Sequence, residues 1–175
     1  MSGLNEGEID SRLQYMMDNV SRWLQFAEAK NGIALTASGG LLFALLGTIY
    51  SKNVMQFHAA FTVLAIGLFL TVIWSSVSLM AKTAIDLSHP TDLSITEATS
   101  LNLIFFGEVR MLAQADYVVR LEKQLGQMTE WQKHLAEQIW QNSRIAYAKY
   151  WFFNRSLFVM EFTGLVALAA YVIHH

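Results

Sequence analysis

Three long blocks of this chain are almost purely apolar, and they set its architecture. Residues 31–51 and 53–81 contain no Asp, Glu, Lys or Arg, and residues 156–173 contain a single acid. A helix needs about 20 mostly apolar residues to cross the hydrocarbon core of a bilayer. The pattern therefore predicts three transmembrane helices, at about 33–50, 57–80 and 155–173.

The N-terminal residues 1–32 have a different pattern, that of an amphipathic helix. Apolar residues recur three and four positions apart, as they do along one face of a helix. These residues are Ile9, Leu13, Met16, Met17, Val20, Leu24 and Ala27. Asn5 with Glu8 suits a capping pair at the start. No proline lies between this segment and the end of the first span, so we expect the helix to continue into that span.

Residues 81–154 form the second region outside the predicted spans, and we expect them to be helical as well. Ser94 followed by Glu97 predicts the start of a short helix. The next helix is expected at about 108–125, with Gly126 as its C-cap. Its candidate core residues are Val109, Leu112, Val119 and Leu121.

The last helix is predicted to be unusually long. Thr129 with Gln132 forms a capping box, and no proline or glycine follows until Gly164. We therefore expect one helix over 130–173 that enters the membrane without a break. Its first part has a stripe of residues for packing: Trp131, Leu135, Ile139, Ala146 and Tyr150.

These elements predict an all-α membrane protein with three transmembrane helices and a small cytoplasmic helical bundle. The expected divisions are an N-terminal amphipathic helix, two transmembrane helices, a cytoplasmic helical region and a third transmembrane helix. Their bounds are 1–32, 33–80, 81–154 and 155–175.

The lysines and arginines predict how the chain is oriented. Three lie in the N-terminal segment, one (Lys52) lies between the first two spans, and eight lie in 82–155. Cytoplasmic loops carry the excess of basic residues. We therefore expect the N-terminus and 81–154 in the cytoplasm and the C-terminus on the opposite side.

Composition excludes several classes of protein. The chain has no cysteine, which excludes a disulfide-bonded secreted domain. Its net charge of -2 argues against binding to nucleic acid polymers. The sequence contains no HExxH, phosphate loop, GxSxG or CxxC motif, so we expect no enzymatic activity.

Glu161 is the most conspicuous single residue, because it interrupts the third apolar block. It lies six residues past Arg155, about 9 Å along a helix, which predicts a position inside the bilayer toward the inner leaflet. An acid inside a membrane is a functional candidate that faces a pore or a partner. The alternative is an interfacial acid neutralised by neighbouring polar groups. Three spans with one acid are too few for a pore in one subunit, so we expect a homo-oligomer.

Cations and aromatics before the last span are candidates for an anionic ligand. Arginine suits bidentate recognition of phosphate, and the cations concerned are Arg110, Arg120, Arg144 and Lys149. The alternative is ion pairing on solvated helix faces. The aromatic cluster that begins at Tyr147 is typical of an anchor at the inner leaflet, and a base-stacking platform is the functional alternative.

Three blocks, in this order, resemble one bacterial family. The first is WLQFAEAKNGIALTASGGLL (23–42), with Glu28 and Lys30 as an acid-x-Lys pair opening the first span. The second is NLIFFGEVRMLAQADYVVRL (102–121), and the third is SRIAYAKYWFFNRSL (143–157), a Lys-Tyr block entering the last span. Over about 20–173 they resemble the transmembrane effectors of Pycsar antiphage defence. That family commonly has Asp where this chain has Glu28.

The resemblance implies a function that composition does not show. Members of that family are encoded beside a cyclase that makes cyclic UMP or cyclic CMP on phage infection. The effector senses this messenger and impairs the inner membrane, so that the infected cell stops growing or dies. We accordingly expect a protein of the bacterial inner membrane, with a periplasmic C-terminus and lipid as a partner. No cofactor is expected, and a cyclic pyrimidine mononucleotide is the activating ligand.

A mechanism follows as a hypothesis. The phosphate of the messenger is expected to meet cytoplasmic cations, and its base to stack on an aromatic residue such as Phe105, Tyr117 or Tyr147. The continuous helix over 130–173 then carries a rotation to Glu161, and the spans open a pore or cluster. Two other functions stay open: a constitutive membrane channel or scaffold without a nucleotide ligand, and a membrane enzyme.

Overall fold

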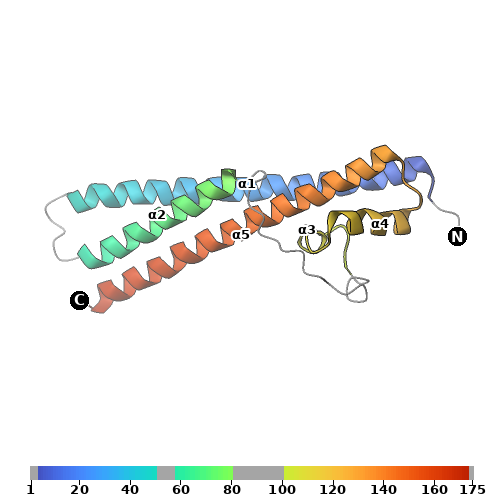
Figure 1. Ribbon diagram of the computed structural model, residues 1–175. Coiled ribbons are helices and arrows are strands. Elements are labelled where there is room, and N and C mark those ends of the chain that lie inside the picture. The colour runs from blue at the N-terminus through green and yellow to red at the C-terminus, as the bar shows by residue number, and fades with distance from the viewer. Residues whose placement is uncertain (1–3, 51–57, 81–100, 174–175) are drawn as a thin grey trace. The chain divides into compact units, whose positions relative to one another are not determined.

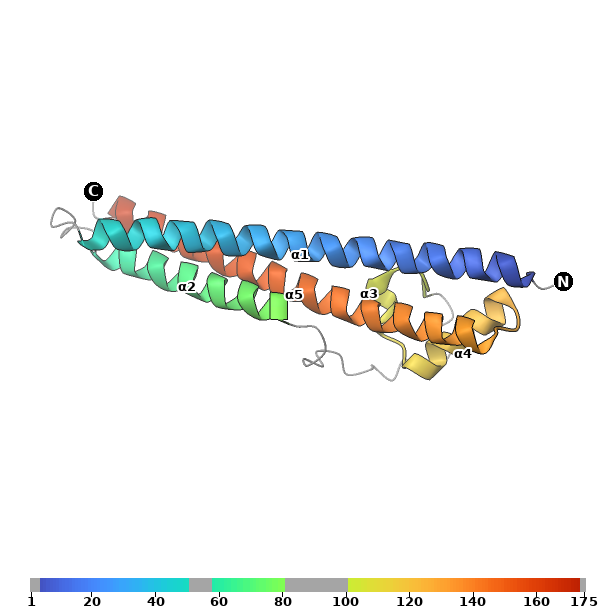
Figure 2. The same ribbon diagram turned by 90° about the horizontal axis from the view of Figure 1, so that it is seen from above.

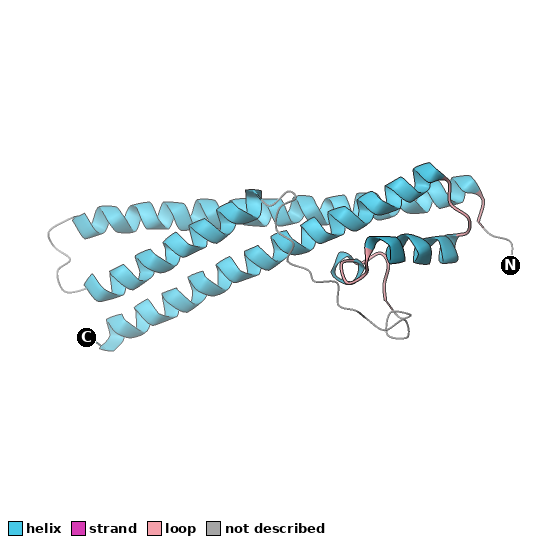
Figure 3. Cartoon of the chain, viewed as in Figure 1, coloured by secondary structure: helices cyan, strands magenta, loops and turns pink. Residues whose placement is uncertain are grey.

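The computed structural model describes residues 4–50, 58–80 and 101–173, and these residues form helices and short loops with no strand (Figure 3). Within these ranges, five helices follow one another (Figure 1). Their bounds are α1 Glu6–Tyr50, α2 His58–Met80, α3 Phe106–Val109, α4 Gln114–Leu125 and α5 Glu130–Ile173. The capping box expected at Ser94 lies outside the described residues.

Helix α1 begins where the sequence predicts and continues without a break to Tyr50. The backbone N–H of Asn5 donates to Glu8 Oε2 (3.0 Å), and the N–H of Glu8 donates to Asn5 Oδ1 (2.9 Å). This reciprocal pair satisfies two donors that a helix start leaves without partners. The predicted apolar face is confirmed, since Ile9, Leu13 and Val20 are buried.

Three helices are long and apolar enough to cross a membrane, as predicted. The qualifying stretches are Glu6–Thr48, Ala60–Met80 and Glu130–Ala170. The last helix is also a single element over Glu130–Ile173, so its predicted continuity is confirmed.

The chain divides into two compact units, and α1 and α5 contribute to both. Unit 1 comprises residues 1–26 and 82–148, and unit 2 comprises 27–81 and 149–175. In unit 1, one apolar cluster joins the first half of α1 to α3, α4 and the first half of α5. Its fully buried members include Leu13, Val109, Tyr117 and Ile139.

The helix predicted at 108–125 is wrong in one respect, because it is broken into α3 and α4. The chain leaves the helix at Arg110, and Ala113 is extended (φ -65°, ψ 151°) before α4 begins. The break buries Leu112 and turns its carbonyl toward Trp140, whose Nε1–H donates to it at 2.8 Å. A buried side chain and a satisfied indole outweigh the hydrogen bonds that a continuous helix would add.

Two further packing expectations are wrong and two caps are confirmed. Val119 and Trp131 are exposed by 62% and 70%, because other residues of α4 and α5 face the core. Gly126 caps α4 with a positive φ of 111°, which favours glycine. Thr129 and Gln132 exchange the two hydrogen bonds of a capping box at the start of α5.

In unit 2, the second half of α1, α2 and the last part of α5 lie side by side (Figure 2). Thr71 Oγ1 of α2 donates to the carbonyl of Ser156 on α5 at 3.4 Å. Gly67 of α2 meets Thr163 of α5 so closely that a Cβ at position 67 would overlap the threonine side chain. Residues 67–71 lie near the middle of α2, so this register places Glu161 level with the middle of that helix.

Candidate functional site

The structure brings two of the predicted ligand residues together in unit 1. The guanidinium of Arg110, at the C-terminal end of α3, lies over the ring of Tyr147 on α5, 3.6 Å from its centroid. Arg110 Nε is buried and has no hydrogen-bond partner among the described residues. A guanidinium stacked on an aromatic face in this way is a cation–π contact.

Arg144 lies close by in sequence, one helical turn before Tyr147. Its guanidinium is 4.8 Å from the ring of Trp140, one turn further back on α5. Trp140 in turn is fixed by its hydrogen bond to Leu112. Two of the predicted cations are therefore stacked on aromatic side chains around the break between α3 and α4.

The other predicted aromatics have structural partners of their own. Tyr117 is fully buried, and its hydroxyl donates to the carbonyl of Leu103 at 3.1 Å. This burial raises the pKa of Tyr117 well above its ordinary value. Phe105 is 42% exposed, and its ring is 5.0 Å from that of Phe106. Arg120 is half-buried on α4.

Lys149 of α5 belongs to unit 2 and is bound there by residues of two other helices, α1 and α2. Only 1% of its side chain is exposed, and Nζ lies 3.0 Å from Glu28 Oε1 of α1. Nζ also donates to the carbonyl of Ser78 on α2 at 3.4 Å. The carbonyl of Lys149 accepts from Asn31 Nδ2 at 3.2 Å. Its charge is therefore already balanced by a carboxylate.

A second cation of unit 2 joins the same two helices. Lys30 Nζ lies over the rings of Tyr150 (5.4 Å) and Phe153 (5.3 Å). The acid-x-Lys pair of α1 thus contacts consecutive residues of α5, with Glu28 on Lys149 and Lys30 on Tyr150. The sequence places these residues in two separate blocks, and it holds no signal that they meet.

Glu161 lies exposed on α5, between the exposed side chains of Phe158 and Leu165. The contacts between α2 and α5 place it level with the middle of α2, and its position toward the inner leaflet stays a prediction. An exposed acid on an apolar helix face is costly in hydrocarbon. This residue is therefore the strongest candidate in unit 2 for contact with a partner or a pore.

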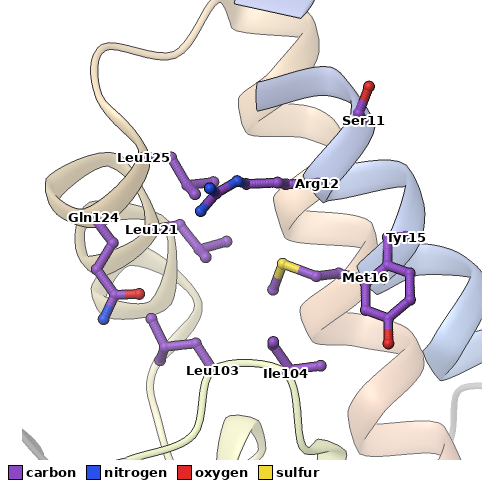
Figure 4. Close-up of a pocket in the computed structure, with 9 residues that line it drawn as sticks. All are labelled: Ser11, Arg12, Tyr15, Met16, Leu103, Ile104, Leu121, Gln124 and Leu125. Carbon is purple, nitrogen blue, oxygen red and sulfur yellow. The ribbon is translucent and has the colours of Figure 1, made fainter. Parts of the chain in front are cut away.

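Unit 1 also contains a cavity of about 380 Å³ that sequence reasoning did not find (Figure 4). It lies between α1, the segment before α3, and α4. The lining residues are Ser11, Arg12, Tyr15, Met16, Leu103, Ile104, Leu121, Gln124 and Leu125. Figure 4 shows Arg12 extending from α1 toward Leu121 and Leu125 of α4. Arg12 and Tyr15 lie next to the buried residues of α1. Their spacing of three residues places them on one face of a helix, and this is the signal for the cavity that the sequence contains.

Among the described residues, no group of three or more His, Asp or Glu side chains is placed to hold a metal ion. The comparisons with known proteins give one finding. A family model described as Pycsar effector protein domain matches residues 12–174. No curated protein and no solved structure matches the chain significantly.

Proposed function

The chain belongs to the Pycsar effector family, which makes it an antiphage defence effector, and from this premise we propose that it senses a cyclic nucleotide messenger and then impairs the bacterial inner membrane. Cyclic UMP or cyclic CMP is the proposed messenger, made by a partner cyclase. Growth arrest or death of the infected cell is the proposed outcome. The observation that carries the proposal is the family match over 163 residues (12–174), nearly the whole chain.

The division of the chain supports separate sensing and membrane functions. Unit 2 contains the second half of α1, α2 and the last part of α5, and all three helices are apolar enough to span a bilayer. Unit 1 contains the apolar cluster, the stacked arginines and the cavity. The basic residues favour a cytoplasmic unit 1 and a periplasmic C-terminus. In this topology the messenger meets unit 1.

Binding alone does not activate an effector. A ligand shifts a conformational equilibrium only by the difference between its affinities for the two states. We propose that the messenger binds the active state more tightly. Helix α5 belongs to both units and is the proposed route to Glu161, and the exposed acid is the proposed contact between copies in a homo-oligomer.

Thermal stability of the detergent-purified protein tests the sensing step. The panel contains cyclic UMP, cyclic CMP, cyclic AMP and a cyclic dinucleotide. A messenger at a hundred times its dissociation constant adds about 2.7 kcal/mol to the stability. A shift with one cyclic pyrimidine nucleotide is the expected result. Folded protein that shifts with none of them contradicts the proposal and favours a constitutive channel or scaffold.

Ion leakage from vesicles that contain the protein tests the membrane step. Messenger-dependent leakage is expected for the natural chain, and Glu161→Gln should reduce it without preventing insertion. Leakage that is the same for both chains removes Glu161 from the gate. The matched control is Glu137→Gln, at an acid of α5 in unit 1 that pairs with His134.

A further inference from the structure

The cavity of unit 1 contains a cation, Arg12, that suits an anionic ligand. Arg12 forms no ion pair or hydrogen bond with any other described residue, and no described side chain that lines the cavity is acidic. Resting on the proposed function, we propose that the messenger binds in this cavity, with its phosphodiester on Arg12 and its base against Tyr15.

The other candidate cations are engaged, which favours Arg12 for the phosphate. Arg110 is stacked on an aromatic ring, and so is Arg144. Lys149 is paired with a carboxylate at 3.0 Å. A ligand that bound these residues would have to replace existing contacts. A ligand of Arg12 gains a charge-assisted, bidentate contact and displaces no contact with a described residue.

Two further side chains at the cavity suit a nucleobase. Tyr15 is 59% exposed and follows Arg12 by three residues, so the two side chains lie on the same face of α1. Every base has a π-face that stacks on such a ring. Gln124 of α4 lines the same cavity and offers both a donor and an acceptor from its amide. Because the amide can turn over, it suits the edge of uracil and that of cytosine equally.

Size and charge select the class of nucleotide. A volume of about 380 Å³ lies at the small end of ligand sites, which measure about 300–1,000 Å³. A cyclic mononucleotide carries one negative charge, and Arg12 is the one cation among the described residues that line the cavity. A cyclic dinucleotide carries two charges, and the second would have no cation here. The cavity therefore favours cyclic mononucleotides over cyclic dinucleotides.

Calorimetry of the full-length protein in detergent, with cyclic UMP, cyclic CMP and cyclic di-AMP as probes, tests this assignment. Arg12→Gln removes the charge, and Arg22→Gln is the matched control, because Arg22 is exposed on the same helix and does not line the cavity. Arg110→Gln tests the rival site. Arg12 has no partner among the described residues, so its substitution should leave the melting temperature without ligand unchanged.

The expected result is that Arg12→Gln weakens binding of the cyclic pyrimidine nucleotide about ten- to a hundredfold, as for loss of a charged hydrogen bond. Arg22→Gln and Arg110→Gln should bind as the natural chain does, and cyclic di-AMP should bind more weakly. Natural affinity in Arg12→Gln overturns the cavity site and leaves the proposed function standing. Absence of binding by every nucleotide to the folded natural chain overturns the proposed function itself. Should Arg12→Gln fail to fold, Tyr15→Ser gives the same readout.

Discussion

The ion pair between Glu28 and Lys149 gives a sharp test of how unit 2 is held together. Only 1% of the Lys149 side chain is exposed, whereas 45% of the Glu28 side chain is exposed. Removing the acid leaves a buried cation, and removing the cation leaves an acid that stays half exposed. We therefore predict that Glu28→Gln destabilises the protein much more than Lys149→Met does.

The size of the difference follows from the burial of each partner. Breaking a buried ion pair by removing one partner costs about 3–5 kcal/mol, because the other charge stays buried. The exposure of Glu28 screens the pair, and Lys149 keeps the carbonyl of Ser78 as an acceptor. We therefore expect about 3 kcal/mol for Glu28→Gln. Lys149→Met removes the buried charge and keeps a long side chain, so its cost should be about 0.2–1 kcal/mol, as for an exposed pair.

Tryptophan fluorescence during thermal unfolding in detergent measures both effects. The ring centroids of Trp74 and Trp151 lie 5.9 Å apart in unit 2, so two of the five tryptophans contribute a signal from this region. A chain of this length loses about 2–4 °C per kcal/mol, which makes the expected decrease for Glu28→Gln about 6–12 °C. Asp18→Asn is the matched control, because Asp18 is an exposed acid elsewhere on α1.

The double variant decides whether the two residues act as a pair. Glu28→Gln with Lys149→Met should be more stable than Glu28→Gln alone, since no buried charge remains. Small and equal shifts for the single variants, with a double variant that only sums them, would refute the reasoning. The stability of unit 2 would then come from contacts other than this ion pair.

Two more substitutions test close packing and a buried hydroxyl. Gly67→Ala should lower the stability by about 1–3 kcal/mol, because the new methyl group overlaps Thr163. The control is Gly40→Ala, which should not lower the stability, because a Cβ at this position meets nothing within 4 Å. Equal melting temperatures for the two variants would contradict the α2–α5 register. Tyr117→Phe should cost about 1 kcal/mol by losing its hydrogen bond to Leu103. Burial raises the pKa of Tyr117 above about 10, so its stabilisation is complete below that pH and is lost as the pH rises further. Unfolding curves recorded up to alkaline pH should show this loss in the natural chain and not in Tyr117→Phe.

Contacts between residues far apart in the chain are the features that the sequence could not predict. Apolar length and capping pairs are local signals, and they located the spans, the start of α1 and the unbroken α5. The break at Arg110 depends on Trp140, which lies 30 residues further along the chain and competes for the carbonyl of Leu112. No local pattern contains that competition, so a continuous helix was the natural expectation.

The candidate site shows the same limit. Arginines and aromatic residues could be chosen as candidate ligand residues from their residue type, and Arg110 does contact Tyr147. Their partners could not be assigned, so the sequence did not separate an engaged cation such as Lys149 from Arg12, which no described residue engages. A cavity arises where side chains from different helices do not fill the space between them. The pattern of residues along one helix does not predict where this happens.

The packing of unit 2 bears on how a membrane effector can be switched. Helices in a bilayer gain little from burying apolar surface, because lipid is as apolar as leucine. The buried residues of unit 2 are accordingly rich in polar groups: Asn31, Ser38, Thr71, Ser75, Ser78, Lys149 and Ser156. Polar contacts between membrane helices average about 0.6 kcal/mol each, so the described arrangement of unit 2 depends on weak contacts together with the ion pair between Glu28 and Lys149. Reversing a two-state equilibrium from 1:99 to 99:1 takes about 5.5 kcal/mol of differential binding. The proposed messenger, if it favours the active state by that amount, offsets the loss of the ion pair and a few hydroxyl contacts, whereas it would not offset the loss of an apolar core such as that of unit 1.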